Sequence, residues 1–280
     1  MTNFLFFFIK LQIFLKSYNI TKLIIMEEIE IFEYKDVDLS NSMLIVAFPT
    51  VGLISSIVGH YIIDTLKLEE VGSVISRHFS PTAIIHKSKP SPPVRIYAGK
   101  KICGPNGKCE QITVIISEFM PPLEIIKPLS DKILEWSKEK NCKIITTLEG
   151  THAIGDIDEK KVNVLGIGSN NNMNKILKDN KIKQTKEGMI TGVTGVLLYS
   201  GVLLNRDVVC LLAEAHSSYP DSRAAAALLE KLDIMLPLIK IDPAPLYKEA
   251  EKIEENIKRF MEQSKPTAPV LPTTPTHMYG

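Results

Sequence analysis

Short apolar runs alternate with longer helix-like stretches between residues 42 and 236, and this alternation restricts the chain to few folds. The run at 43–48, MLIVAF, is apolar throughout, as expected of a strand that is covered on both faces. The stretch at 53–66 comes after a short turn and has the length of a helix. Such alternation favours an α/β fold with a mainly parallel sheet and helices on both faces.

The rest of the folded part has the same pattern. The shorter apolar segments between 83 and 116 suggest antiparallel strands added to the sheet, and the asparagines at 170–172 suggest a helix entry. Asp221 is a suitable N-cap for a helix that ends at Leu236. Further helices are expected at 125–140 and 192–204, and further strands at 71–75, 83–86, 94–98, 112–116, 143–148, 162–167 and 208–213.

Composition excludes some classes of partner. The chain has 280 residues, enough for one large domain or two small ones, and a formal net charge of +1. A near-neutral chain with 7% aromatic residues and no basic stripe is not expected to bind nucleic acid or acidic lipid.

The two ends differ from the middle, which we take as a core domain at 26–242. Residues 1–25 hold an apolar run at 4–9, but lysines at positions 10, 16 and 22 interrupt the remainder of the segment, so a membrane span is not expected. We interpret 1–25 as an upstream extension before a start at Met26, with an interfacial anchor as the alternative. A helix is predicted at 243–263, with an apolar seam that could pack on its own domain or on a neighbouring subunit: Leu246, Ala250, Ile253, Ile257 and Phe260.

Residues 264–280 form a proline-rich tail that is expected to be disordered. A proline at every third position, from Pro266 to Pro275, suits a polyproline II rod. At ~3.1 Å per residue the rod could hold Tyr279 roughly 40 Å from its anchor. The tail ends in Met278, Tyr279 and Gly280, a hydrophobic residue, a tyrosine and a terminal carboxylate. Capture of such an end is a recurring mode of recognition, although many chain ends are merely disordered.

The four cysteines leave three alternatives open. Cys103 and Cys109 flank a turn-rich loop and could face each other across a hairpin, whereas Cys142 and Cys210 lie beside apolar strands. Free thiols are the expected state, with a Cys103–Cys109 disulfide as the alternative. A metal is not expected, because a zinc site would need two close pairs of ligands.

No catalytic signature is found. The turn at 49–52 occupies the place of a nucleotide-binding loop but lacks both glycine-rich phosphate motifs, so no cofactor is expected. Gly52 and Gly59 are seven apart, which favours close packing of one helix face. Two polar clusters lie at strand ends, and Glu118 could join them in acid–base chemistry, although helix capping is the simpler interpretation: Glu149 with His152, and Glu214 with His216.

Four segments together resemble the proteasome assembly chaperone 2 (PAC2) family in its archaeal branch. They are AFPTVGL at 47–53, GVTG at 192–195, LAE at 212–214 and YPDSRAA at 219–225. Thr50 stands where the family usually has a second glycine, and Ser222 where it often has proline. The resemblance covers about residues 27–240.

The resemblance implies a core similar to nucleoside phosphorylases without established catalysis. It also implies a homo-oligomer that helps proteasome α subunits to assemble. The missing phosphate loop argues against a nucleotide-driven activator, so we expect a non-enzymatic, ATP-independent, cytoplasmic factor that assembles or binds the proteasome. Some archaeal members end in a hydrophobic–tyrosine–X (HbYX) tail that docks on the α ring of the 20S particle, and Met278, Tyr279 and Gly280 match it. The alternative is a phosphorylase- or hydrolase-like enzyme that uses Glu149, His152, Glu214 and His216.

Overall fold

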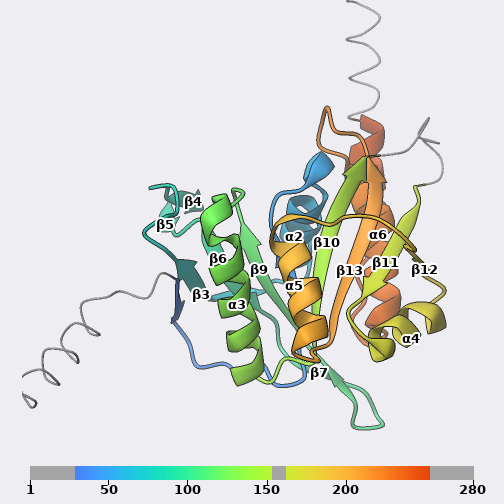
Figure 1. Cartoon of the computed structure of the whole chain (residues 1–280), viewed down its shortest axis with the longest axis horizontal. Coiled ribbons are helices and arrows are strands. Elements are labelled where there is room, and N and C mark those ends of the chain that lie inside the picture. The colour runs from blue at the N-terminus through green and yellow to red at the C-terminus, as the bar shows by residue number, and fades with distance from the viewer. Residues whose placement is uncertain (1–28, 87, 153–161, 253–280) are drawn as a thin grey trace, which may run out of the picture.

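The computed structural model describes residues 29–86, 88–152 and 162–252. Figure 1 shows one large twisted sheet with helices packed against it. Two small hairpins, β4–β5 and β7–β8, extend from the sheet. The elements in chain order are β1 (Glu30–Glu33), β2 (Met43–Ala47), the 3-10 turn η1 (Val51–Leu53), α2 (Ile54–Thr65), β3 (Glu69–Ile75), β4 (Ile84–His86), β5 (Lys89–Ser91), β6 (Val94–Ala98), β7 (Ile102–Cys103), β8 (Cys109–Glu110), β9 (Ile112–Ser117), α3 (Leu123–Glu139), β10 (Ile144–His152), β11 (Val164–Gly168), α4 (Asn171–Asp179), β12 (Lys183–Gln184), α5 (Gly192–Leu203), β13 (Val208–Ala215) and α6 (Ser222–Met235).

The sheet is mixed, which corrects the expectation of a mainly parallel one. Its strand order is β1-β3-β6-β9-β2-β10-β13-β11-β12. The central strands β9, β2, β10 and β13 are parallel, whereas β1, β3 and β6 are antiparallel to their neighbours, and β11 is antiparallel to β13. The reason lies in the connections: no helix separates β3, β6 and β9, and a parallel pairing needs a long crossover. The antiparallel strands expected between 83 and 116 are confirmed.

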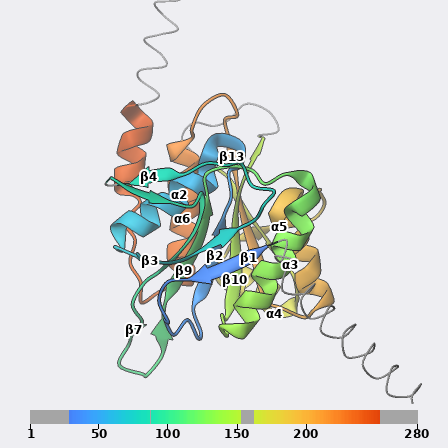
Figure 2. The ribbon, with the colours of Figure 1, turned by 90° about the vertical axis from the view of Figure 1, so that its left-hand side faces the viewer.

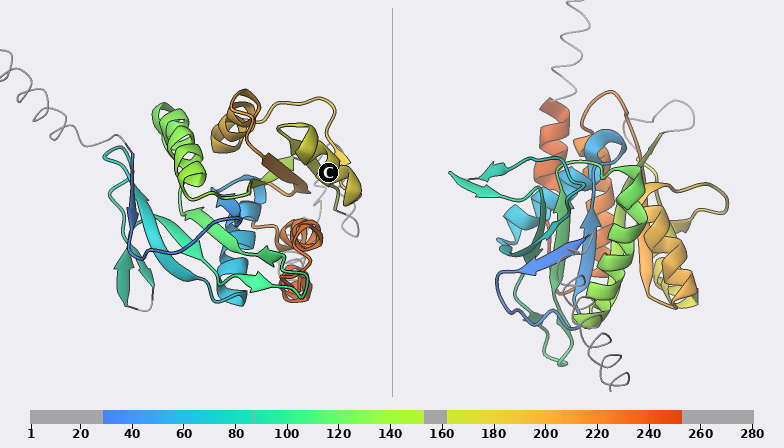
Figure 3. Two further views of the ribbon diagram at one scale, coloured as in Figure 1. Left: turned by 90° about the horizontal axis from the view of Figure 1, so that it is seen from below. Right: turned by 60° about the vertical axis from the view of Figure 1, so that its left-hand side comes forward.

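Helices cover both faces of the sheet, as the alternation predicted. In Figures 2 and 3, α2 and α6 lie on one side and α3 and α5 on the other. Successive residues of a strand point to opposite faces. Ile45 of β2 therefore packs in the core beneath α2 and α6, while its neighbours Leu44 and Val46 pack beneath α3 and α5. Both faces of the central strands are buried, which explains why β2 is apolar throughout.

The polar residues that were expected at the starts of α4 and α6 are found there as N-caps. The Asp221 carboxylate accepts a hydrogen bond from the Ala224 N–H at 2.9 Å, and Asn170 accepts one from the Met173 N–H at 3.0 Å. β10 extends beyond the strand that was predicted at 143–148. Its apolar run ends at Leu148, but pairing with β13 continues to His152, because backbone groups pair regardless of side-chain polarity.

Cys103 and Cys109 form a disulfide across the β7–β8 hairpin, where they are register partners. This corrects the expectation of free thiols at these positions. The two cysteines directly face each other because the five residues between them fold into a tight turn, closed by a hydrogen bond from Gly104 N–H to the Lys108 carbonyl at 2.8 Å. Cys142 and Cys210 are buried free thiols, as expected.

The predicted C-terminal helix is seen in its first half, residues 244–252. Leu246 and Ala250 are buried, and Leu246 lies in the same core as α2 and α6, so this part of the seam packs on its own domain. The rest of the seam, the extension at 1–25 and the tail at 264–280 lie outside the described residues. Among the helices that the structure describes, none has the length and apolar character to cross a membrane.

Candidate functional site

The strand–turn–helix segment at 47–53 is braced on both sides. The Thr50 hydroxyl accepts a hydrogen bond from the Gly150 N–H at 3.2 Å, and the Ser55 hydroxyl donates to the Phe48 carbonyl. Gly150 lies against the turn so closely that a Cβ there would overlap the carbonyl oxygen of Val51. The turn is therefore held against β10 by backbone contact.

The other side of the turn is joined to the loop after β13. Gly52 has a φ of 64°, a conformation that favours glycine, and its carbonyl accepts the Asp221 N–H at 2.8 Å. A Cβ at Gly52 would lie 3.0 Å from the His216 carbonyl oxygen. One at Gly59 would lie 3.0 Å from the Ala47 Cβ. Both glycines are closely packed, as expected, but Gly52 lies in η1 before α2, so the two do not share one helix face.

Asp221 links this loop to α6. Besides capping the helix, its carboxylate accepts the His216 N–H at 3.0 Å and lies 2.9 Å from His216 Nδ1. The His216 ring stacks on Tyr219 with 4.8 Å between ring centroids. His216 is thus part of a structural network, in keeping with the capping interpretation.

The four residues of the two predicted polar clusters do not come together in one site. Thr151 pairs with Glu214 and His152 with Ala215, so Glu149 and Glu214 lie on the α5 face while His152 lies on the opposite face. Glu214 accepts a hydrogen bond from the Asn163 side chain at 2.8 Å. The register of β10 and β13 therefore separates the imidazole of His152 from the carboxylates that it was expected to assist.

Glu149 is the most perturbed acid at this edge. Burial raises the pKa of its carboxyl to about 7, and a hydrogen bond with the Thr194 side chain acts in the opposite direction. Thr194 lies in the first turn of α5, within the segment GVTG at 192–195. A carboxyl group with such a pKa can hold or release a proton near neutral pH, which acid–base chemistry would require.

Glu118 belongs to a different cluster, on the α2 face of the sheet. Its carboxylate lies 3.3 Å from His60 Nε2 and pairs with the guanidinium of Arg95. The hydrogen bond with His60 lowers the pKa of Glu118, assisted by the charge of Arg95. Arg95, which is 3% exposed, was not among the predicted site residues. The sequence feature that could have revealed Arg95 is its position as the one charged residue in the apolar run VRIYA. A charge buried in such a strand needs a partner of opposite charge.

The predicted tripeptide Met278, Tyr279 and Gly280 lies outside the described residues. Figure 1 shows where the described chain ends: the red helix at 244–252 lies at the same end of the molecule as the arrowheads of β10 and β13. Across the described ranges, no group of three or more His, Cys, Asp or Glu side chains is arranged to hold a metal ion.

These features define an α/β protein with a mixed sheet, in which a strand–turn–helix segment is locked against the loop after β13. The model of the PAC2 family matches residues 44–261. The chain belongs to the PAC2 family, as the sequence resemblance indicated.

Three known proteins give the extent of the similarity. The uncharacterized protein MJ0106 of Methanocaldococcus jannaschii is 31% identical over 237 residues, which are 85% of this chain and 92% of that protein. PbaA of Pyrococcus furiosus, described as an archaeal homolog of proteasome-assembly chaperone, superposes with a TM-score of 0.73 at 30% identity, covering 85% of this chain and 93% of PbaA. PbaB of the same organism, an archaeal proteasome activator, has a TM-score of 0.73 at 22% identity, covering 84% of this chain and 100% of PbaB, and shows the shared fold.

Proposed function

We propose that this protein is a cytoplasmic, ATP-independent proteasome-assembly chaperone or proteasome-binding factor. The observation that carries the proposal is the similarity to PbaA, which spans 85% of the chain in both sequence and fold. A hydrolase- or phosphorylase-like enzyme has no comparable support, because Glu149 and Glu214 lie on one face of the sheet and His152 lies on the other.

We further propose that the tail docks on the α ring of the 20S particle through Met278, Tyr279 and Gly280. The Gly280 carboxylate would pair with a basic group, the Tyr279 ring would fill a groove and donate its hydroxyl hydrogen, and Met278 would add adaptable apolar contact. One tail alone should bind weakly. Several tails on one oligomer would act at high effective concentration and gain ~10²–10⁴ in affinity.

Deleting residues 278–280 should weaken binding to purified archaeal 20S particles by at least about 100-fold, because the multivalent contact is lost. Surface plasmon resonance with immobilised particles measures the change. Thr276→Ala, in the same tail but outside the tripeptide, is the matched control and should bind as the unaltered protein does. Equal binding by the deletion variant would show that the folded body makes the contact.

Self-association is proposed to use the outer face of α5. This helix is apolar on all sides, yet Tyr199, Val202 and Leu203 are 45%, 60% and 78% exposed. An apolar helix is normally covered on every side.

A second copy of the chain suits this patch for two reasons. Val196, Tyr199 and Leu203 recur at steps of three and four, the seam spacing of paired helices. The neighbouring surface of α3 carries both charge signs in the Lys127–Asp131 ion pair (2.7 Å), so two copies related by a twofold axis can match opposite charges. An isologous contact of this kind joins two copies and would present two tails on one particle.

Leu203→Glu should weaken self-association at least about tenfold, because it places a charge within the apolar patch, at its most exposed residue on α5. Light scattering coupled to size exclusion measures the mass. Ile234→Glu is the matched control: Ile234 is also exposed (47%) but lies on α6, across the sheet. An unchanged oligomer in the Leu203 variant, or a monomeric parent protein, would refute the α5 interface.

A further inference from the structure

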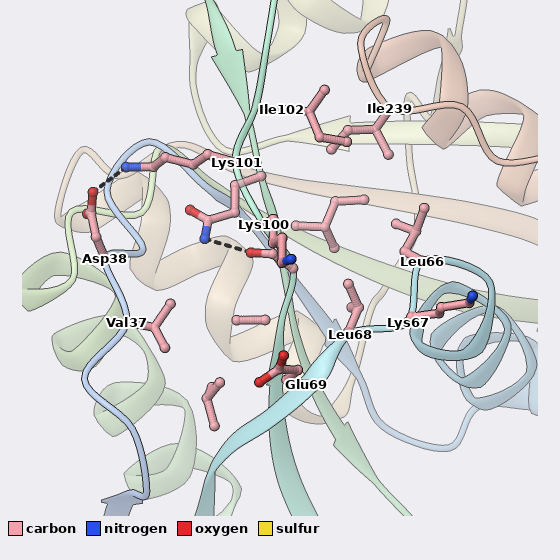
Figure 4. Close-up of a pocket in the computed structure, with 15 residues that line it drawn as sticks. Val37, Asp38, Leu66, Lys67, Leu68, Glu69, Lys100, Lys101, Ile102 and Ile239 are labelled. Atoms are coloured by element: carbon pink, nitrogen blue, oxygen red, sulfur yellow. Dashed lines mark hydrogen bonds and ion pairs between the residues drawn. The ribbon is translucent and has the colours of Figure 1, made fainter.

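A cavity of about 650 Å³ opens at the edge of the sheet, near the start of β9. Figure 4 shows Val37 and Asp38, on the segment after β1, facing Leu68 and Glu69 across it. Ile239, from the segment after α6, closes the upper part of this view. The volume is within the range of ligand pockets, and most of the lining is aliphatic.

The cavity exists because β1 leaves β3 early. β1 pairs only with the second half of β3, from Gly72 to Ile75, and backbone contact ends at the Val71 carbonyl, which accepts the Tyr34 N–H at 2.7 Å and the Lys35 N–H at 3.4 Å. Beyond that point Glu69 and Glu70 pair on one side only, with β6. An unpaired strand edge presents free N–H and C=O groups to an incoming strand.

Positive charge gathers at one end of this open edge. Within the described chain, Asp38 pairs with Lys101 and Glu69 pairs with Lys35, whereas Lys67 and Lys100 are in no ion pair. The hydrogen bond with Lys35 lowers the pKa of Glu69, and the charge of Lys100 adds to this effect, so Lys100 lies near that carboxylate. Lys67 precedes β3 and Lys100 comes after β6. Because Glu69 and Ala98 are register partners, both lysines lie at the same end of the open edge.

The cavity wall also holds an unsatisfied acceptor. Gln111 is 3% exposed, and its Nε2 donates to the Gly99 carbonyl at 2.9 Å. Its Oε1 is buried without a hydrogen-bond partner among the described residues. A buried acceptor of this kind is stabilised when an incoming group donates to it.

We propose that this cavity binds the carboxyl-terminal end of an extended peptide from a partner protein. The peptide adds to the free edge of β3, a known mode of recognition. An antiparallel orientation brings its terminal carboxylate to Lys67 and Lys100, since these lysines lie at the amino end of β3. Alternate apolar side chains enter the cavity, and charge complementarity selects an acidic end. The proposal does not depend on the tail of this chain docking on the proteasome.

The test uses the full-length protein and a labelled peptide, acetyl-Thr-Val-Thr-Ile-Thr-Val with a free carboxylate. The peptide should bind, and its C-terminal amide should bind at least about tenfold more weakly, because a charge-assisted contact is lost. Hydrogen exchange at residues 69–71 should slow when the peptide binds. A double variant, Lys67→Glu with Lys100→Glu, should weaken binding at least about tenfold, whereas Lys175→Glu on the surface of α4 should have no effect.

Several results would overturn the proposal. They are equal affinity of the acid and the amide, protection outside β3, or binding that survives the double lysine variant. Slow exchange at 69–71 before peptide is added would mean that a segment of the chain itself covers the edge. Octanoate binding that depends on both lysines, with no peptide binding, would assign the cavity to a small amphipathic carboxylate. Circular dichroism of the variants shows that the fold is retained.

Discussion

Gly150→Ala is expected to destabilise the protein by at least about 3 kcal/mol, since overpacking against backbone is costly. The new Cβ would overlap the carbonyl oxygen of Val51, and a backbone atom cannot rotate away as a side chain can. Either β10 or the turn at 49–53 must shift, and the hydrogen bond from the Gly150 N–H to Thr50 (3.2 Å) is then lost. Urea denaturation measures the loss.

Gly107→Ala is the control for this prediction. Gly107 also has a demanding backbone, with a φ of 72°, but a Cβ there meets nothing within 4 Å. Its substitution should cost about 1 kcal/mol, the strain of the backbone conformation alone. If Gly150→Ala costs no more than Gly107→Ala, the turn is not fixed by contact with β10.

Glu149→Gln should stabilise the protein at pH 8.5 by about 3 kcal/mol and leave its stability at pH 4 nearly unchanged. Burial raises the pKa of the Glu149 carboxyl from 4.5 to about 7, and each pKa unit corresponds to ~1.4 kcal/mol. The folded state therefore holds the proton more tightly than the unfolded state does. The stability that this protonation supplies is complete below pH 4.5 and is lost as the pH rises through 7.

Denaturation curves between pH 4 and pH 8.5 measure this effect. The glutamine variant keeps the shape of the side chain and its hydrogen bond to Thr194 but cannot ionise, so its stability should depend less on pH. Glu139→Gln serves as the control, because Glu139 is an exposed carboxylate on the surface of α3. An unaltered pH dependence in the Glu149 variant would contradict the burial of an ionisable group at this position.

Most of the elements can be predicted from local sequence signals. The apolar run at 43–48 predicted β2, and Asp221 predicted the start of α6, because caps and buried strands depend on neighbours in the sequence. The antiparallel direction of the strands between 83 and 116 was predicted, whereas that of β1, β3 and β11 was not. The alternation of strand and helix stops between β3 and β9, and connection length is what decides between parallel and antiparallel pairing.

The candidate site was harder to predict than the fold. Glu149 and His152 are three apart in one strand, so they point to opposite faces, a relation that became visible only once β10 was known to continue to His152. Glu118 joined Arg95 and His60 because β6, β9 and α2 meet there, although these residues are far apart in the sequence.

The sequence by itself determined most strand and helix segments, the helix caps and the family, since each depends on residue types at short and regular spacing. The tertiary structure alone decided the mixed sheet, the disulfide between Cys103 and Cys109, and the division of the polar cluster between two faces. It also decided that Gly150 supports the turn at 49–53. The physical reason is that strand register and close backbone approach join residues far apart in the chain, and no local pattern records them.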